Sequence, residues 1–229
     1  MIASAVKVGN MIVMLAIFIL LPLTVVLNAV EPSANLKYLP APKTEGTISV
    51  EAAISKRRSV RSFSRESLMD DVLSQILWAA QGITDKQNHR RAAPSAGATY
   101  PLETYLVTAK GVYHYHPDKH ALTEVKQGDA RKALAEAALG QRWLREAPAI
   151  LVFTAVPERT TRRYGSRGMM YIHMEAGHAA ENVHLQAVAL GLGSVPIGAF
   201  SDQDVAKVLD LPKGEIPLYL IPVGKEKTE

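Results

Sequence analysis

No cysteine occurs among the 229 residues, and this absence removes several classes of function at once. A cysteine nucleophile, a disulfide framework and an iron–sulfur cluster ligated by thiolates are all excluded. The net charge of +4 is small for this length, so the composition does not indicate a nucleic-acid-binding protein. Hydrophobic residues make up 48% of the chain, which is enough for one domain with a sizeable core.

Charge is absent from residues 8–30, which form the longest apolar stretch. As a helix this stretch would span roughly 34 Å, enough to cross a bilayer. It is longer than the usual core of a signal peptide, Leu27-Asn28-Ala29 is a poor cleavage site, and no twin-arginine motif precedes it. We therefore expect residues 1–30 to be a retained membrane anchor, with a cleaved signal peptide as the alternative.

Lys7, on the N-terminal side of the apolar stretch, favours an extracytoplasmic or exported position for the rest of the chain. Residues 31–46 are rich in proline and polar residues, which is typical of a tether. Residues 47–229 are then expected to form one globular domain.

Hydrophobic periodicity in that domain predicts helices that alternate with a few strands. Helices are expected at 50–56, from about 68 to 81, at 129–139 and at 170–190, and another is expected to end before Pro212. Ser67 with Asp70, and Ser201 with Asp204, have the spacing of capping boxes. Apolar runs predict strands at "ETYLVTA", "VYHYH", "PAILVFTAV" and "IPLYLIPVG". The stripe of the 170–190 helix is mostly alanine, so we expect an α+β sandwich with this helix at its centre.

Two common nucleotide and hydrolase fingerprints are missing. The segment "GLGSVPIG" has Pro196 where a dinucleotide-binding G-x-G-x-x-G needs its third glycine, and it follows a helix instead of a strand. The chain has no G-x-S-x-G elbow at this point either. Neither a Rossmann site nor an α/β-hydrolase site is therefore indicated.

The histidines form two groups, "HYHPDKH" and "HMEAGHAAENVH". His173 and His184 share a helix face but lie roughly 16 Å apart, too far to bind one metal ion. No metal site is expected, although a histidine-dependent metalloprotein stays open as an alternative. The segment "KRRSVRSF" is either a solvated basic turn or a phosphate site, since clustered arginines suit small anions.

Four segments in order resemble the nitroreductase superfamily of FMN flavoproteins, and most closely its SagB-type branch of thiazoline and oxazoline dehydrogenases. They are "RRSVRSF", "APSAGATYPLE", "EAGHAAENVHLQAVALGLGSVPIGAF" and "LYLIPVG", and the resemblance covers residues 48–225. It implies an α+β sandwich with a mixed sheet, assembled as a homodimer with one FMN at each subunit interface. The loop of small residues would then lie against the flat isoalloxazine ring.

The resemblance also assigns residues to the site. It implies that Arg57, Arg58 and Ser59 hold the phosphate and ribityl chain, that Lys225 reaches the phosphate, and that Arg61 lies near flavin N1. Pro94, Ser95, Ala96 and Gly97 would line the ring on one side. Pro196, Ile197, Gly198 and Ala199 would line the other side, with the Gly198 N–H facing N5.

One departure from the family pattern concerns the substrate. The azoline dehydrogenases have a Lys-Tyr pair before the central helix, where this chain has Arg163 and Tyr164. Arginine does not lose its proton in proteins, so a lysine-type base is missing and Tyr164 is the expected proton-transfer residue. The overall expectation is an FMN-dependent oxidoreductase that passes hydride through flavin N5 in a ping-pong scheme. NAD(P)H is a possible donor, and the substrate is a small molecule or a peptide. The alternative is a flavin-binding scaffold or partner subunit without turnover.

Overall fold

The computed structural model describes residues 36–227, which contain a seven-stranded sheet in the order β1-β6-β5-β4-β7-β9-β8. The strands are β1 (Leu36–Tyr38), β4 (Leu102–Thr108), β5 (Gly111–His116), β6 (Ala121–Gln127), β7 (Ala149–Ala155), β8 (Gly193–Ser194) and β9 (Ile216–Gly224). Every ladder between these strands is antiparallel. The parallel component of the mixed sheet is a single bridge between Ser59 and Ser194.

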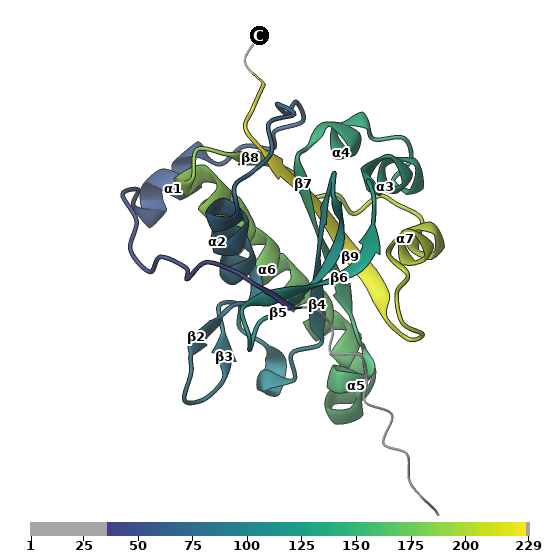
Figure 1. The fold of residues 1–229 in the computed structure, drawn as a ribbon. Helices are drawn as coiled ribbons and strands as arrows, with labels where there is room; N and C mark the ends of the chain where they lie inside the picture. Colours follow the sequence, from purple (N-terminus) through teal and green to yellow (C-terminus); the bar gives the residue numbers. More distant parts are fainter. Residues whose placement is uncertain (1–35, 228–229) are drawn as a thin grey trace, which may run out of the picture. The chain divides into compact units, whose positions relative to one another are not determined.

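Helices cover both faces of the sheet (Figure 1). One face packs against α2 (Asp70–Gln81) and α6 (Gly168–Ala189), and the other against α3 (Arg131–Ala137), α4 (Arg142–Glu146) and α7 (Asp202–Leu209). The central strand β7 is buried along its whole length because it is covered on both sides. This agrees with its sequence, a continuous apolar run without alternation. The α+β sandwich predicted from the sequence is confirmed.

The alanine stripe of α6 explains how this 22-residue helix fits inside the domain. Ala176, Ala179, Ala180 and Ala187 are all buried, and their small side chains let α2 and the sheet approach closely. Gln75 of α2 reaches across to Gln186 of α6, with 3.2 Å between Nε2 and Oε1. The helix therefore presents one face to the core and leaves the opposite face at the surface.

Element boundaries were predicted well where a cap or a turn residue marks them. The α1 helix (Val50–Lys56) has the predicted bounds, and Ser201 caps α7 by accepting from the Asp204 N–H at 3.3 Å. The capping box at Ser67 was wrong. The N-cap of α2 is Met69, which has no side-chain cap bond, because the helix begins at Asp70.

Several elements have no clear signal in the sequence. They are α4, α5 (Glu158–Tyr164), β1, β6, the short 3-10 helices η1 (Ala96–Ala98) and η2 (Gly165–Arg167), and the two-stranded sheet of β2 (Ile83–Asp85) and β3 (Arg90–Arg91). Strand β1 falls within the stretch taken as a tether and pairs with β6. Farther on, the Lys43 N–H donates to Gln75 Oε1 at 2.8 Å. Residues 36–43 thus lie along the domain, through long-range backbone pairing that composition does not reveal.

The anchor or signal helix expected at residues 1–30 lies outside the described residues, so it stays a prediction. Within residues 36–227, no helix combines the length and apolarity needed to cross a bilayer.

Candidate functional site

The arginine segment, residues 57–61, leaves the end of α1 and runs across one end of α6. Arg57 is the C-cap of α1, and its Nε lies 3.9 Å from Oε1 of Glu181 on α6. Arg58 turns the other way and donates to the carbonyls of Ser55 and Arg57, at 3.0 and 2.7 Å. Its guanidinium therefore stabilises the C-terminal end of α1.

Ser59 and Val60 fix this segment beside the loop that follows α6. Ser59 forms the parallel bridge with Ser194, and the Val60 N–H donates to the Ser194 carbonyl at 3.1 Å. A Cβ on Gly193 would lie 2.5 Å from Val60 Cγ2, so a glycine is needed for this approach. Arg61 is exposed at the surface, with its guanidinium 5.9 Å from the ring centre of Trp143.

A buried histidine lies beneath the arginine segment. His184 of α6 is 4% exposed, and its Nδ1 is 2.7 Å from Ser194 Oγ. Burial, together with the charge of Arg57, lowers the pKa of His184 to about 4. The histidine is therefore neutral at physiological pH and supports Ser194 without adding charge.

The loop of residues 196–199 lies next to β9. Ile197 is buried and exchanges two backbone hydrogen bonds with Leu220, at 2.8 and 3.0 Å. Gly198 and Ala199 are exposed, and the Ala199 carbonyl accepts from Gln141 Nε2 at 3.0 Å. Within residues 36–227 no hydrogen bond uses the Gly198 N–H, so it is available to a ligand.

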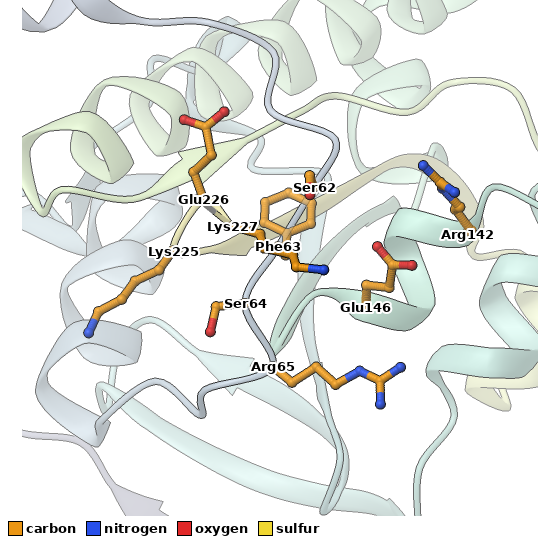
Figure 2. Close-up of a pocket in the computed structure, with 9 residues that line it drawn as sticks. All are labelled: Ser62, Phe63, Ser64, Arg65, Arg142, Glu146, Lys225, Glu226 and Lys227. Carbon is orange, nitrogen blue, oxygen red and sulfur yellow. The ribbon is translucent and has the colours of Figure 1, made fainter. Parts of the chain in front are cut away.

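Lys225 follows β9 and lines a polar cavity of about 630 Å³ (Figure 2). Its Nζ lies 3.0 Å from Oε2 of Glu66, and the Lys225 carbonyl accepts from the Ser64 N–H at 2.9 Å. Figure 2 shows Lys225 and Arg142 on opposite sides of the segment that follows Arg61. Besides Lys225, this cavity contains none of the predicted site residues; its other lining residues are Ser62, Phe63, Ser64, Arg65, Arg142, Glu146, Glu226 and Lys227.

The loop of small residues, 94–97, lies near the other end of α6 and contacts α5. Gly97 has φ 59°, and a Cβ at this position would lie 2.5 Å from the Tyr164 hydroxyl and 2.6 Å from Arg163 Nη1. Arg163 donates from Nη1 to the Gly97 carbonyl at 3.2 Å. Only glycine meets both demands without strain: a left-handed backbone and a close approach by two side chains.

Helix α5 holds the continuation of this loop. Thr160 Oγ1 lies 2.8 Å from Thr99 Oγ1, and Arg159 Nη1 donates to the Tyr100 carbonyl at 3.2 Å. Ala98 and Tyr100 have φ of 53° and 44°, which is unusual for residues other than glycine. Because α5 supplies several contacts to this strained backbone, the loop and the helix form one unit.

Tyr164, the predicted proton-transfer residue, ends α5 with its ring half-buried. Its ring stands edge-on to Tyr171 of α6, with 5.1 Å between centroids. The described structure places the Tyr164 hydroxyl beside Gly97, a contact that no sequence spacing indicates.

The predicted residues thus form two groups. The first joins the arginine segment to Ser194, beside Glu181 and His184; the chain continues from Ser194 into residues 196–199, and a hydrogen bond from the Ser64 N–H connects the Lys225 carbonyl to the segment that follows Arg61. The second joins loop 94–97 and Tyr164 near Tyr171 and Glu175. Since Glu175 and His184 are nine residues apart on one helix, the groups are separated by about 13 Å along the α6 axis.

The histidines of the β5–β6 hairpin each have a protein partner. His114 Nε2 lies 2.7 Å from Glu103 Oε2, and His116 Nε2 lies 2.8 Å from Thr123 Oγ1. His120 Nδ1 lies 2.8 Å from the Tyr115 hydroxyl. Among residues 36–227 no three histidine or acidic side chains are grouped to hold a metal ion.

The family model described as "Nitroreductase family" matches residues 54–225, the stretch that contains both groups. This chain belongs to the nitroreductase family. The resemblance read from the four motifs is therefore confirmed.

Individual nitroreductase relatives extend this finding. A candidate nitroreductase of Methanocaldococcus jannaschii is 44% identical over 185 residues, 78% of this chain and 92% of that protein. The FMN reductase [NAD(P)H] of Bacillus subtilis is 27% identical, over 75% of this chain and 64% of its own length. The microcin B17-processing protein McbC of Escherichia coli is 26% identical, over 71% of this chain and 68% of its own.

Solved nitroreductase structures share the fold. A candidate nitroreductase from Ralstonia eutropha superposes with a TM-score of 0.78 at 28% identity, over 85% of this chain and 90% of that one. A chain of the E. coli microcin synthetase McbBCD complex, solved with truncated pro-MccB17 bound, gives a TM-score of 0.66 at 25% identity. It covers 84% of this chain and 79% of that one.

The residues present fit the flavin that nitroreductases typically bind. Arg58 and Arg61 have no carboxylate partner among the described residues, so their charges are available to an anion. Arg57 and Lys225 are each paired with one glutamate at the surface, and such pairs contribute little and exchange readily. Loop 94–97 carries only small side chains, so a flat ring can approach its backbone.

Proposed function

We propose that this nitroreductase-family protein is an FMN-dependent oxidoreductase. The observation that carries the proposal is the arginine segment, in which Arg58 and Arg61, without a carboxylate partner within residues 36–227, flank Ser59 at the surface. Charge-assisted hydrogen bonds from such groups suit a phosphate. FMN matches this single anion site better than a dinucleotide cofactor does, because the chain has no dinucleotide-binding fingerprint. The FMN reductase among the relatives supports the same cofactor.

The roles follow from the two groups. Arg57, Arg58, Ser59 and Lys225 bind the phosphate and ribityl chain, and Arg61 provides positive charge where the reduced ring becomes negative. Pro94–Gly97 and Pro196–Ala199 would hold the ring, and the Gly198 N–H, which no hydrogen bond uses within residues 36–227, would be a donor to it. Bound FMN supplies hydride chemistry at N5, and the protein supplies orientation and electrostatics.

In this proposal Tyr164, and not Arg163, is the residue that transfers a proton to or from the substrate. Arg163 is always charged and already donates to the Gly97 carbonyl. A phenol can donate or accept a proton in the transition state when its hydroxyl lies at the site. The Tyr164 hydroxyl is next to Gly97, where a ring stacked on the loop would bring a substrate.

A homodimer completes the site. The surface face of α6 exposes Met170 and Met174, 45% and 49% accessible, and a Cβ on Gly177 would meet nothing within 4 Å. Exposed apolar residues around a glycine suit close approach by a second helix. If two copies of α6 cross in antiparallel fashion at Gly177, the first group of one protomer lies beside the second group of its partner.

The substrate is a small molecule or a peptide; the similarity to McbC favours a peptide, and the similarity to the FMN reductase [NAD(P)H] favours NAD(P)H as the electron donor. A second candidate function is a flavin-binding subunit without turnover, because Arg163 replaces a base with a structural contact. We also propose that residues 1–30 anchor or export the protein, with residues 47–229 on the extracytoplasmic side.

Purification of the full-length protein tests the proposal. A flavin absorbs near 450 nm, a property of the chromophore, and mass spectrometry of the released compound identifies FMN. Arg57→Ala should weaken FMN binding by about 10- to 100-fold, whereas Lys132→Ala, which removes an exposed cation on α3, should not. A colourless protein that takes up no added FMN refutes the proposal. Steady-state turnover with NAD(P)H and a quinone distinguishes an enzyme from a flavin-binding subunit without turnover.

A further inference from the structure

Glu175 is a buried carboxyl group that the proposed mechanism does not use. It lies on α6 and is 3% exposed. Its Oε1 is fully buried and has no hydrogen-bond partner among the described residues. A buried carboxylate without full hydrogen bonding is unfavourable, and a proton removes the charge. Burial raises the pKa of Glu175 to about 7, although Ser95 and Arg91 act in the opposite direction.

The surroundings of Glu175 contain one nearby positive charge. Arg91 of β3 is the charged group that acts on the Glu175 carboxyl within residues 36–227. Arg91 is itself engaged elsewhere: its Nη1 donates to Gln81 Oε1 of α2 at 3.0 Å, and its guanidinium lies 4.6 Å from the Tyr100 ring centre. Glu103, Asp118 and Arg159 also act on Arg91. The carboxyl is therefore compensated only in part.

Ser95, in the loop of small residues, is the hydroxyl that acts to lower the pKa of the Glu175 carboxyl. Its Oγ accepts from the Tyr100 N–H at 3.0 Å, so one lone pair is used and the hydroxyl proton is free to donate. If Glu175 is ionised, the best acceptor for that proton is the carboxylate. If Glu175 is protonated, its own O–H can donate to the second lone pair of Ser95 Oγ. The Ser95 proton can then point outward to a ligand.

We propose that Glu175 is a positioning residue that binds one proton beneath loop 94–97 and so directs the Ser95 hydroxyl toward bound flavin. This role rests on the proposed function, because the ligand of the loop is FMN. Glu175 does not touch the ligand; it acts through Ser95. Release of its proton turns the Ser95 hydroxyl inward and removes one hydrogen bond from the ligand.

The expected consequence is an affinity for FMN that depends on the Glu175 proton. One lost hydrogen bond weakens binding by about 3- to 10-fold. The FMN phosphate and the α6 histidines also titrate, so the informative quantity is the ratio of the dissociation constants of the wild type and Glu175→Gln at each pH. Glutamine mimics the protonated carboxyl, since its amide also donates to Ser95.

The test measures FMN dissociation constants of the full-length protein by flavin fluorescence from pH 5.5 to 8.5. The FMN dissociation constant of the wild type divided by that of Glu175→Gln should be near one at pH 5.5 and rise about 3- to 10-fold by pH 8.5. Ser95→Ala, with and without Glu175→Gln, should abolish this rise, and Glu136→Gln, an exposed carboxyl on α3, should leave the wild-type profile unchanged. A ratio that stays flat, or a rise that persists without Ser95, overturns the proposal.

An infrared measurement distinguishes a failure of this inference about Glu175 from a failure of the proposed function. Difference spectra of flavin-free wild type and Glu175→Gln at pH 6 should show the carbonyl band of one protonated carboxyl, and its absence overturns the proposal. If the band is present but wild type binds no FMN, the proposed function is refuted, and the role at the flavin falls with it. If FMN binds and the ratio is flat, only the role of Glu175 is refuted.

Discussion

Replacing Glu175 by glutamine should make the protein more stable at alkaline pH and leave it unchanged at acid pH. The pKa of the carboxyl rises on folding from an ordinary 4.5 to about 7, mainly because it is buried. The difference of 7 − 4.5 = 2.5 units, at about 1.36 kcal/mol per unit, gives about 3 kcal/mol. Since the folded-state pKa is the higher one, the favourable contribution is complete below pH 4.5. It is lost as the pH rises through 7.

The assay is urea unfolding of flavin-free wild type and Glu175→Gln from pH 4.5 to 8.5, because a bound ligand would add its own stabilisation. The two unfolding free energies should be close at pH 4.5 and diverge to about 3 kcal/mol in favour of the variant by pH 8.5. Glu136→Gln should follow the wild type throughout. Parallel curves for wild type and Glu175→Gln would show that the carboxyl ionises normally and would refute the reasoning.

Three further predictions test the two groups. Gly97→Ala and Gly140→Ala both impose a left-handed backbone on alanine, at a cost of about 1–2 kcal/mol in folding stability. Only the alanine at position 97 would collide with Tyr164, so only Gly97→Ala should also lose FMN affinity. Equal FMN affinity in the two variants would contradict the close approach of Tyr164 to Gly97. Tyr164→Phe keeps the packing on Tyr171 and should retain FMN while turnover falls about 100-fold; an unchanged rate would leave the residue a packing role. Gly177→Leu should stabilise α6 by about 0.8 kcal/mol and yield monomers in light scattering; a persisting dimer would place the interface elsewhere.

Periodicity and caps predicted the elements whose burial follows from their own residues. Strand β7 reads as a buried strand because its seven residues are all apolar or small. Helix α7 is marked by Ser201 at its start. By contrast, α5 has the sequence "ERTTRRY", in which only Thr160 is buried, so it has no apolar stripe to detect. It contacts residues 97–100 and Tyr171 of α6, and neither set of contacts can be read from its own sequence.

The residues of the candidate site also divide into those that the local sequence indicates and those that depend on distant parts of the chain. The arginine segment and loop 94–97 could be proposed as site candidates from the sequence because their residue types are informative locally. Glu175 was missed because a glutamate in "HMEAGH" reads as a solvent-facing helix position, and its burial depends on a loop 80 residues earlier. His184 was considered from the sequence only as a possible metal ligand, yet its side chain is buried against Ser194. In both cases a distant segment covers a polar side chain and changes its protonation.

Arg163 connects these observations. A lysine at this position would be able to lose its proton beside the ring, but the arginine is permanently charged and contacts the Gly97 carbonyl. The substitution therefore converts a titratable position into a fixed contact that stabilises a left-handed backbone. A group near this loop that titrates near neutral pH is therefore to be sought at another residue. Glu175 is such a group, because its carboxyl is buried and Ser95 of the same loop acts on its pKa. The protonation of Glu175 and the rigidity of loop 94–97 therefore bear on the same part of the site.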